Sequence, residues 1–133
     1  MIDKENEVYT RVNEIVMSKF PGAHMDSEYV SVPAGFPHVS LYQSDSYTPS
    51  NREDNSLKPK FTVMTFEVNV YSNKKTGKKQ ECKKIMEEID DVMHSMNLRR
   101  IVMTPVPNLN DSTIYRLTAR YQGEASESTF YRR

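Results

Sequence analysis

The feature that most constrains the fold is a strand pattern joined by a short turn to a helix pattern, within residues 61–96. In FTVMTFEVNVY (61–71), apolar and polar residues alternate, as in a strand with one face in a core. The apolar residues that follow recur with a helical period: Cys82, Ile85, Met86, Ile89, Val92, Met93 and Met96. A helix with one apolar stripe needs a surface to cover, so this unit predicts a helix packed on a sheet.

The rest of the chain supplies further elements of the same kind. Residues 4–19 predict a leading helix with an apolar stripe at Val8, Val12, Ile15 and Val16, ended by Pro21 and Gly22. Strands are expected at 29–32, 38–43, 99–106 and 113–123, with a short edge strand within 128–133. This order predicts an α+β fold: a single two-layer domain over residues 1–133, with an antiparallel or mixed sheet and about two helices on one face.

Residues 44–60 form the most unusual segment, because they are polar throughout and contain two prolines. A structureless loop of this length in a small domain is usually functional or disordered. We therefore expect an interaction loop here, with Tyr47 and Arg52 as candidate contacts.

Composition excludes several function classes. The 133 residues carry 18 basic and 18 acidic side chains, so no overall charge draws the chain toward nucleic acid or an anionic membrane. A single cysteine, Cys82, rules out an intrachain disulfide and a cysteine-based metal cage. The charged N-terminus and the lack of a long apolar run predict neither secretion nor a membrane span.

The turn before the second helix, KKTGKK, is similar to the end of a phosphate-binding loop. That motif needs a glycine where this chain has Ser72 and a serine or threonine where it has Lys79. Without the first glycine the backbone cannot wrap a phosphate, so this interpretation fails.

The lysines leave three interpretations open: a nucleic-acid patch, a solvated turn, or one pole of a charge-polarised helix. Within residues 74–84 the only acidic residue is Glu81, and the basic residues are Lys74, Lys75, Lys78, Lys79, Lys83 and Lys84. The acidic residues that follow are Glu87, Glu88, Asp90 and Asp91. This order opposes the helix dipole, so the helix itself does not explain it. A helix of this polarity can pair head to tail with a copy of itself, a contact of the kind that closes rings.

Groups for catalysis are nearly absent. Cys82 belongs to an apolar stripe and His94 to the opposite, solvent face of the same helix. No zinc spacing or dinucleotide-binding motif occurs, so we expect no metal, no cofactor and no enzyme. The eight methionines, among them Met86, Met93, Met96 and Met103, are expected to fill the core. Arg116 and Arg120 share a strand face with Thr118, either as a polar outer face or as a surface between subunits.

The second half of the chain resembles a family. The stretches that carry the resemblance are FEVNVYSNKKTGKKQECKKIMEEID, MNLRRIVMTPVPNLNDSTIYRLTARYQGE and the terminal FYRR, within residues 61–133. They are similar to the small tail terminator, or tail completion, proteins of siphophages with Gram-positive hosts. The first 60 residues match this family in layout alone.

The resemblance implies a structural virion protein at the tail–neck junction, assembled in the host cytoplasm. Such a subunit forms a hexameric ring with copies of itself on the tail tube protein and meets the head–tail connector or stopper. DNA passes through the ring as cargo. Two alternatives stay open: another connector component (a stopper or adaptor), and a small nucleic-acid-binding module that uses Lys74–Lys84.

Overall fold

The alternating segment is the central strand of the sheet. The computed structural model describes residues 4–28, 33, 35–47, 62–107, 113–125 and 130–131. In it, β3 (Thr62–Ser72) pairs antiparallel with β2 (His38–Tyr47) on one side and with β5 (Tyr115–Ala125) on the other. Every residue of β3 is buried, so this strand anchors both faces of the sheet.

Shorter strands complete a mixed sheet in the order β1-β2-β3-β5-β4. β4 (Arg99–Pro105) lies antiparallel to β5, and β1 (His24–Asp26) lies parallel to β2. The two-residue strand β6 (Phe130–Tyr131) pairs with the end of β5. The parallel β1–β2 pair is what makes the sheet mixed.

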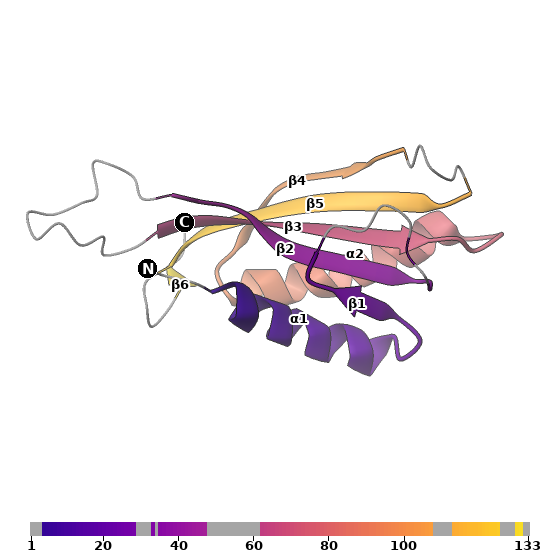
Figure 1. Cartoon of the computed structure of the whole chain (residues 1–133), viewed down its shortest axis with the longest axis horizontal. Coiled ribbons are helices and arrows are strands. Elements are labelled where there is room, and N and C mark those ends of the chain that lie inside the picture. The colour runs from indigo at the N-terminus through magenta and orange to yellow at the C-terminus, as the bar shows by residue number, and fades with distance from the viewer. Residues whose placement is uncertain are drawn as a thin grey trace, which may run out of the picture.

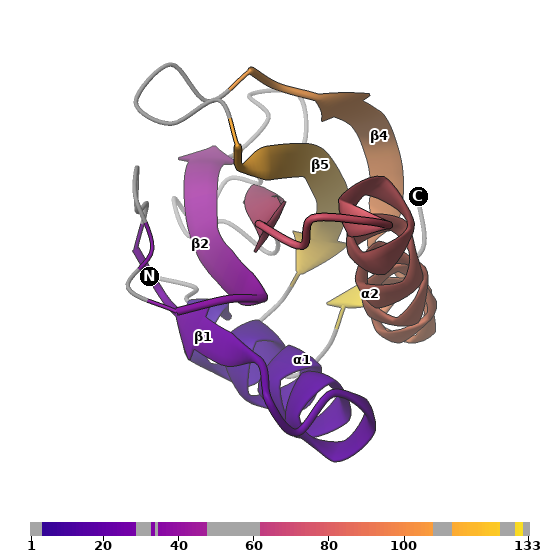
Figure 2. The ribbon, with the colours of Figure 1, turned by 90° about the vertical axis from the view of Figure 1, so that its right-hand side faces the viewer.

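Two helices cover one face of this sheet (Figure 1). α1 (Glu5–Lys19) packs against β2, and α2 (Lys78–Ser95) packs against β3 and β5. The helices also contact each other, and the view along the strands in Figure 2 shows both on the same side of the curved sheet. The predicted α+β class, with two helices on one face, is confirmed.

The core lies between the helices and the apolar face of the sheet. Val8, Val12 and Val16 of α1 are fully buried against the cluster that holds Phe66 and Val68 of β3. α2 adds its predicted stripe, which includes the fully buried Cys82. The core positions expected from helical and strand periods are thus largely confirmed.

The structure corrects one expected segment and adds a strand that was not expected, and two expected segments lie outside the described residues. Residues 44–47, expected in a loop, continue β2, where a bulge between Gln43 and Asp45 keeps the strand paired to β3. β1 was not expected, because three residues are too few to show a period. The strand expected at 29–32 lies outside the described residues, and so does the remainder of the loop expected at 44–60.

Of the four methionines named above, Met103 was wrongly expected in the core. Met86, Met93 and Met96 are buried, whereas the Met103 side chain is 39% exposed. It lies on β4, which in the described part of the chain pairs with β5 along one side and with no strand on the other, and so forms an edge of the sheet. A strand at an edge lacks the second neighbour that would cover its side chains.

The two edges of the sheet differ in how far other parts of the chain cover them. On the β2 side, β1 covers the beginning of the strand, and the Glu5 carboxylate of α1 accepts a hydrogen bond from the Gln43 backbone N–H at 2.7 Å. On the β4 side, all seven residues of the strand are exposed. The described part of the chain therefore covers the first part of the β2 edge and leaves the β4 edge open along its whole length.

We predict that Gly123→Ala destabilises the fold, because Gly123 lets the turn between α2 and β4 approach β5. A Cβ atom there would lie 2.7 Å from Leu98 Cδ2 and 3.0 Å from the Asn97 carbonyl oxygen. Displacing packed atoms of this kind costs about 1–3 kcal/mol of the free energy of unfolding, measured by urea denaturation. Gly22→Ala is the matched control, because no atom lies within 4 Å of its added Cβ. Equal stability of the two variants would contradict the close approach.

Candidate interaction surfaces

The lysine turn is first of all the junction between β3 and α2. Gly77 precedes the helix in a left-handed conformation with φ 82°, which glycine adopts without strain. The carboxylate of Glu81, in the first turn of α2, accepts a hydrogen bond from Ser72 Oγ at 2.6 Å and pairs with Lys74 Nζ at 3.4 Å. Ser72, the residue that breaks the phosphate-loop motif, therefore ties the end of β3 to the start of α2.

The other lysines divide into one that is engaged and several that are free. Lys78 Nζ donates a hydrogen bond to the Thr113 carbonyl oxygen at 3.2 Å. The basic side chains without a partner among the described residues are Lys75, Lys79, Lys83 and Lys84. Part of the basic cluster thus serves the fold, and the rest is available to another molecule.

The acidic end of α2 shows the same division. Glu88 pairs with Lys19 of α1 at 3.1 Å, which joins the two helices. Asp90 Oδ1 accepts a hydrogen bond from Tyr121 Oη at 3.0 Å and lies 3.5 Å from Arg100 Nη1. Glu87 and Asp91 make no ion pair within the part of the chain that the structure describes.

A groove of about 480 Å³ runs between α2 and the open edge of the sheet. Its lining residues are Lys83, Met86, Glu87, Asp90, Asp91, Arg100 and Met103. Next to it, Ile101 and Val102 are 44% and 41% exposed, beside the exposed Met103. We call the free charges Lys83, Glu87 and Asp91 together with Ile101–Met103 the α2–β4 surface. It combines unpaired charges of both signs with exposed apolar side chains, a composition suited to contact with protein.

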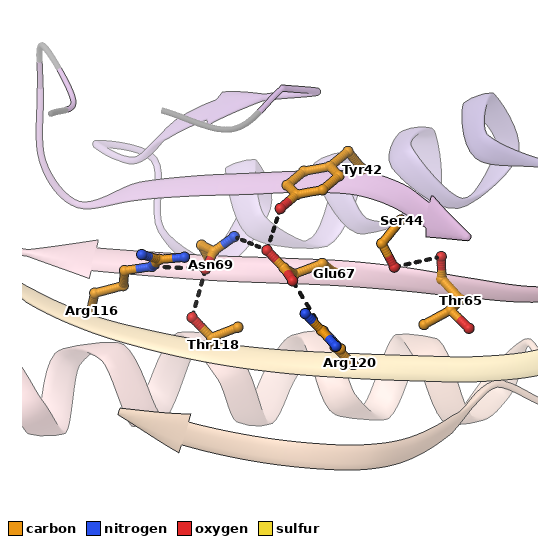
Figure 3. Close-up of polar contacts among 8 residues, drawn as sticks. All are labelled: Tyr42, Ser44, Thr65, Glu67, Asn69, Arg116, Thr118 and Arg120. Carbon is orange, nitrogen blue, oxygen red and sulfur yellow. Dashed lines mark hydrogen bonds and ion pairs between the residues drawn. The ribbon is translucent and has the colours of Figure 1, made fainter. Parts of the chain in front are cut away.

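The opposite face of the sheet carries a buried polar network (Figure 3). Glu67, in the centre of β3, is only 7% exposed. Its carboxylate accepts hydrogen bonds from Tyr42 Oη, from Asn69 Nδ2 at 3.1 Å and from Arg120 Nε at 3.1 Å. Three donors satisfy the charge, which is what a buried carboxylate requires.

Asn69 extends this network to the next residues of β5. Its Oδ1 accepts hydrogen bonds from Arg116 Nε at 3.0 Å and from Thr118 Oγ1 at 2.6 Å. The Arg116 guanidinium also lies over the Tyr71 ring, 5.9 Å from its centroid. Arg116 and Arg120, candidates for an inter-subunit surface, therefore both have partners inside the chain.

The pKa shifts follow from this geometry. Burial acts to raise the pKa of Glu67, but the hydrogen bonds from Tyr42, Asn69 and Arg120 outweigh it, so the pKa lies below its usual value. Burial and the hydrogen bond to Glu67 raise the pKa of Tyr42 to about 12. At neutral pH the pair is thus an ionised carboxylate and a neutral phenol.

The side chains considered as candidate reactive groups are either buried in the core or exposed on the surface. Burial raises the pKa of the Cys82 thiol to about 12, and its Sγ lies 3.5 Å from the Val70 carbonyl oxygen. His94 is exposed, as expected. Among the described residues, no cluster of three or more His, Cys, Asp or Glu side chains could hold a metal ion. No helix in these parts of the chain is long and apolar enough to cross a membrane.

The remaining predicted contacts lie in β2 and beyond it. Tyr47 is the last residue of β2, and Arg52 lies outside the described residues. Several functional candidates were missed from the sequence: Tyr42, Asn69, Arg100, Ile101, Val102 and Met103. Polar residues inside the otherwise apolar segment 62–72 signalled a network, but its partners depend on strand order and register.

Comparison with known proteins adds no family. No protein-family model matches the chain, and no curated protein matches it. The functional argument therefore depends on the residues and their geometry.

We predict that Glu67→Gln lowers stability and weakens its acid dependence. Because the pKa of Glu67 is lowered in the folded chain, its contribution is present above the ordinary carboxyl pKa and is lost as pH falls. The substitution should cost about 1–3 kcal/mol at pH 7, since it weakens hydrogen bonds to a buried charge. It should also reduce the loss of stability below about pH 5 in urea denaturation series.

Glu14→Gln is the control for this series. Glu14 is exposed on α1, so the same change in charge should leave both the stability and its pH dependence nearly unchanged. If Glu67→Gln and Glu14→Gln behave alike across this pH range, the network does not hold an ionised carboxylate.

Proposed function

We propose that this chain is a structural assembly subunit of a siphophage tail, a tail terminator or tail completion protein. In this proposal, copies form a ring of six on the head-proximal end of the tail tube. The ring ends tube growth and offers a surface to the head–tail connector, and DNA passes through it without being read. The protein acts by binding other proteins and catalyses no reaction.

The α2–β4 surface is the observation that carries the proposal. The chain pairs many of its charges internally, as Lys74, Glu88, Asp90 and Arg120 do. Lys83, Glu87 and Asp91 have no partner in the described part of the chain and lie beside exposed Ile101 and Val102. Leaving such residues without partners in the free chain is consistent with a subunit that buries them on assembly.

The resemblance of residues 61–133 to tail terminators supports the same proposal from the sequence. In the structure these residues form β3, α2, β4, β5 and β6, which include the whole α2–β4 surface. The stretch that carries the resemblance therefore coincides with the surface that we assign to assembly. Another neck component, such as a stopper or adaptor, would use a surface of the same kind, and its position in the virion would separate the two.

The nucleic-acid interpretation has weaker support. Lys74 and Lys78 are engaged with Glu81 and Thr113, which leaves fewer free cations than the sequence suggests. Of the two tyrosines beside the turn among the described residues, Tyr71 is fully buried and Tyr115, the partner of Ser72, is half-buried, so neither offers a fully exposed ring for stacking. Micromolar or tighter DNA binding that falls steeply with salt would favour this alternative over assembly.

We predict that a phage with a null allele of this gene makes tails of irregular length or tails that do not join to heads. Electron microscopy of lysates measures both defects, and a plasmid copy of the wild-type gene should correct them. Glu87→Lys reverses a free charge on the α2–β4 surface, so this copy should fail to correct them. Glu14→Lys makes the same change on an exposed part of α1 outside this surface and should succeed. Normal virions from the null allele would contradict the proposed function.

A further inference from the structure

The proposed function accounts for the exposed side chains of the α2–β4 surface, but it does not say what pairs with the backbone edge of β4. Among the described residues, β4 pairs with β5 alone, and its segment Ile101–Thr104 carries no charged side chain. Native edges are usually blunted by charges, proline or bulges. Here Arg99, Arg100 and Pro105 flank the segment and a bulge lies between Arg100 and Val102, so the protection stops at its ends.

We propose that the free chain forms a two-fold dimer in which β4 pairs antiparallel with β4 of a second copy. The pairing joins two sheets edge to edge and covers Ile101, Val102 and Met103 of both copies. The occupant of the open edge is therefore the same chain.

Charge on the strand selects the antiparallel direction. Arg99 and Arg100 lie at the beginning of β4, and Thr104 and Pro105 at its end. In a parallel pair the arginines of two copies would lie side by side and repel each other. In an antiparallel pair centred on Val102 or Met103 they lie at opposite ends, next to uncharged residues of the partner copy.

Charge on α2 independently selects the same arrangement. α2 runs antiparallel to the adjacent β4, since a short turn at 96–98 joins the two elements and Asp90, near the end of the helix, lies 3.5 Å from Arg100, near the beginning of the strand. The two-fold axis of this pair lies between the two β4 strands and is perpendicular to the sheet. It therefore places both α2 helices on the same face of the joined sheet, running in opposite directions. The basic half of one α2, with Lys83, then faces the acidic half of the other, with Asp91. The charge order that opposes the helix dipole becomes complementary in this dimer.

The inference does not depend on the proposed function. A two-fold contact cannot close a ring of six, so this dimer would be a form of the free chain. If the proposed function also holds, the dimer covers the α2–β4 surface before assembly and must open at the tail. A monomeric free chain would leave the ring proposal intact, and a normal null-allele phage would leave the dimer intact.

Size-exclusion chromatography with light scattering at low salt tests the dimer. The wild-type chain should have twice the monomer mass at about 100 μM and dissociate on dilution. Ile101→Lys places a charge on the edge and should yield a monomer. Lys83→Glu places like charges in opposition and should weaken dimerisation by about tenfold or more. Folding of each variant is checked by circular dichroism, and Lys83→Glu, on the helix surface, keeps the test valid if Ile101→Lys does not fold.

Two further variants test the assigned partners. Lys83→Glu combined with Asp91→Lys exchanges the two charges in every copy, so it should restore the dimer. Lys84→Glu is the matched control, because Lys84 is equally exposed but does not line the groove. A wild-type monomer, a species larger than a dimer, or a dimer insensitive to Ile101→Lys and Lys83→Glu would overturn the proposal.

A cysteine cross-link tests the two-fold geometry. Val102→Cys or Met103→Cys places a cysteine near the axis, so it should form a disulfide with the same position of the second copy under mild oxidation, whereas Arg99→Cys should not. The native Cys82 is fully buried and does not compete. If neither axial cysteine cross-links, the contact is not two-fold.

Discussion

The structure depends on a central strand that is buried on both faces. One face of β3 places Phe66 and Val68 under the helices, as any amphipathic strand does. The other face holds the carboxylate of Glu67, which is tolerable in a buried position only because Tyr42, Asn69 and Arg120 donate to it. Those donors come from β2, β3 and β5, so the network fixes the register of three strands as well as satisfying a charge.

Because both faces of β3 are buried, the surface that other molecules can contact lies at the margin of the sheet. The first half of the β2 margin is covered by β1 and by the contact from Glu5, whereas β4 is exposed throughout. α2 follows this open margin and carries free charges of both signs along it. The charges that the fold does not use thus lie together with the apolar residues that the fold does not cover, and this coincidence favours assembly as the function.

The sequence was sufficient for what depends on local periods and insufficient for what depends on neighbours. The strand of residues 61–71, both helices and the burial of Cys82 follow from apolar spacing, which is set by the geometry of a single element. The strand order, the open edge at β4 and the exposure of Met103 depend on which strands pair, which spacing does not encode. For the same reason, Arg116 and Arg120 could be placed on one face, but their partners Asn69 and Glu67 lie 47 and 53 residues away along the chain.

Hydrogen exchange, measured on the free subunit and on the same subunit in purified tails, tests the central claim most directly. The free subunit is measured at a dilution where it is monomeric. We expect the amides of β4 and of the α2 segment that lines the groove to exchange more slowly in tails, because assembly buries the α2–β4 surface. The strands that carry the Glu67 network should exchange slowly and equally in both states. Equal exchange of β4 in the two states, with new protection elsewhere, would contradict the account.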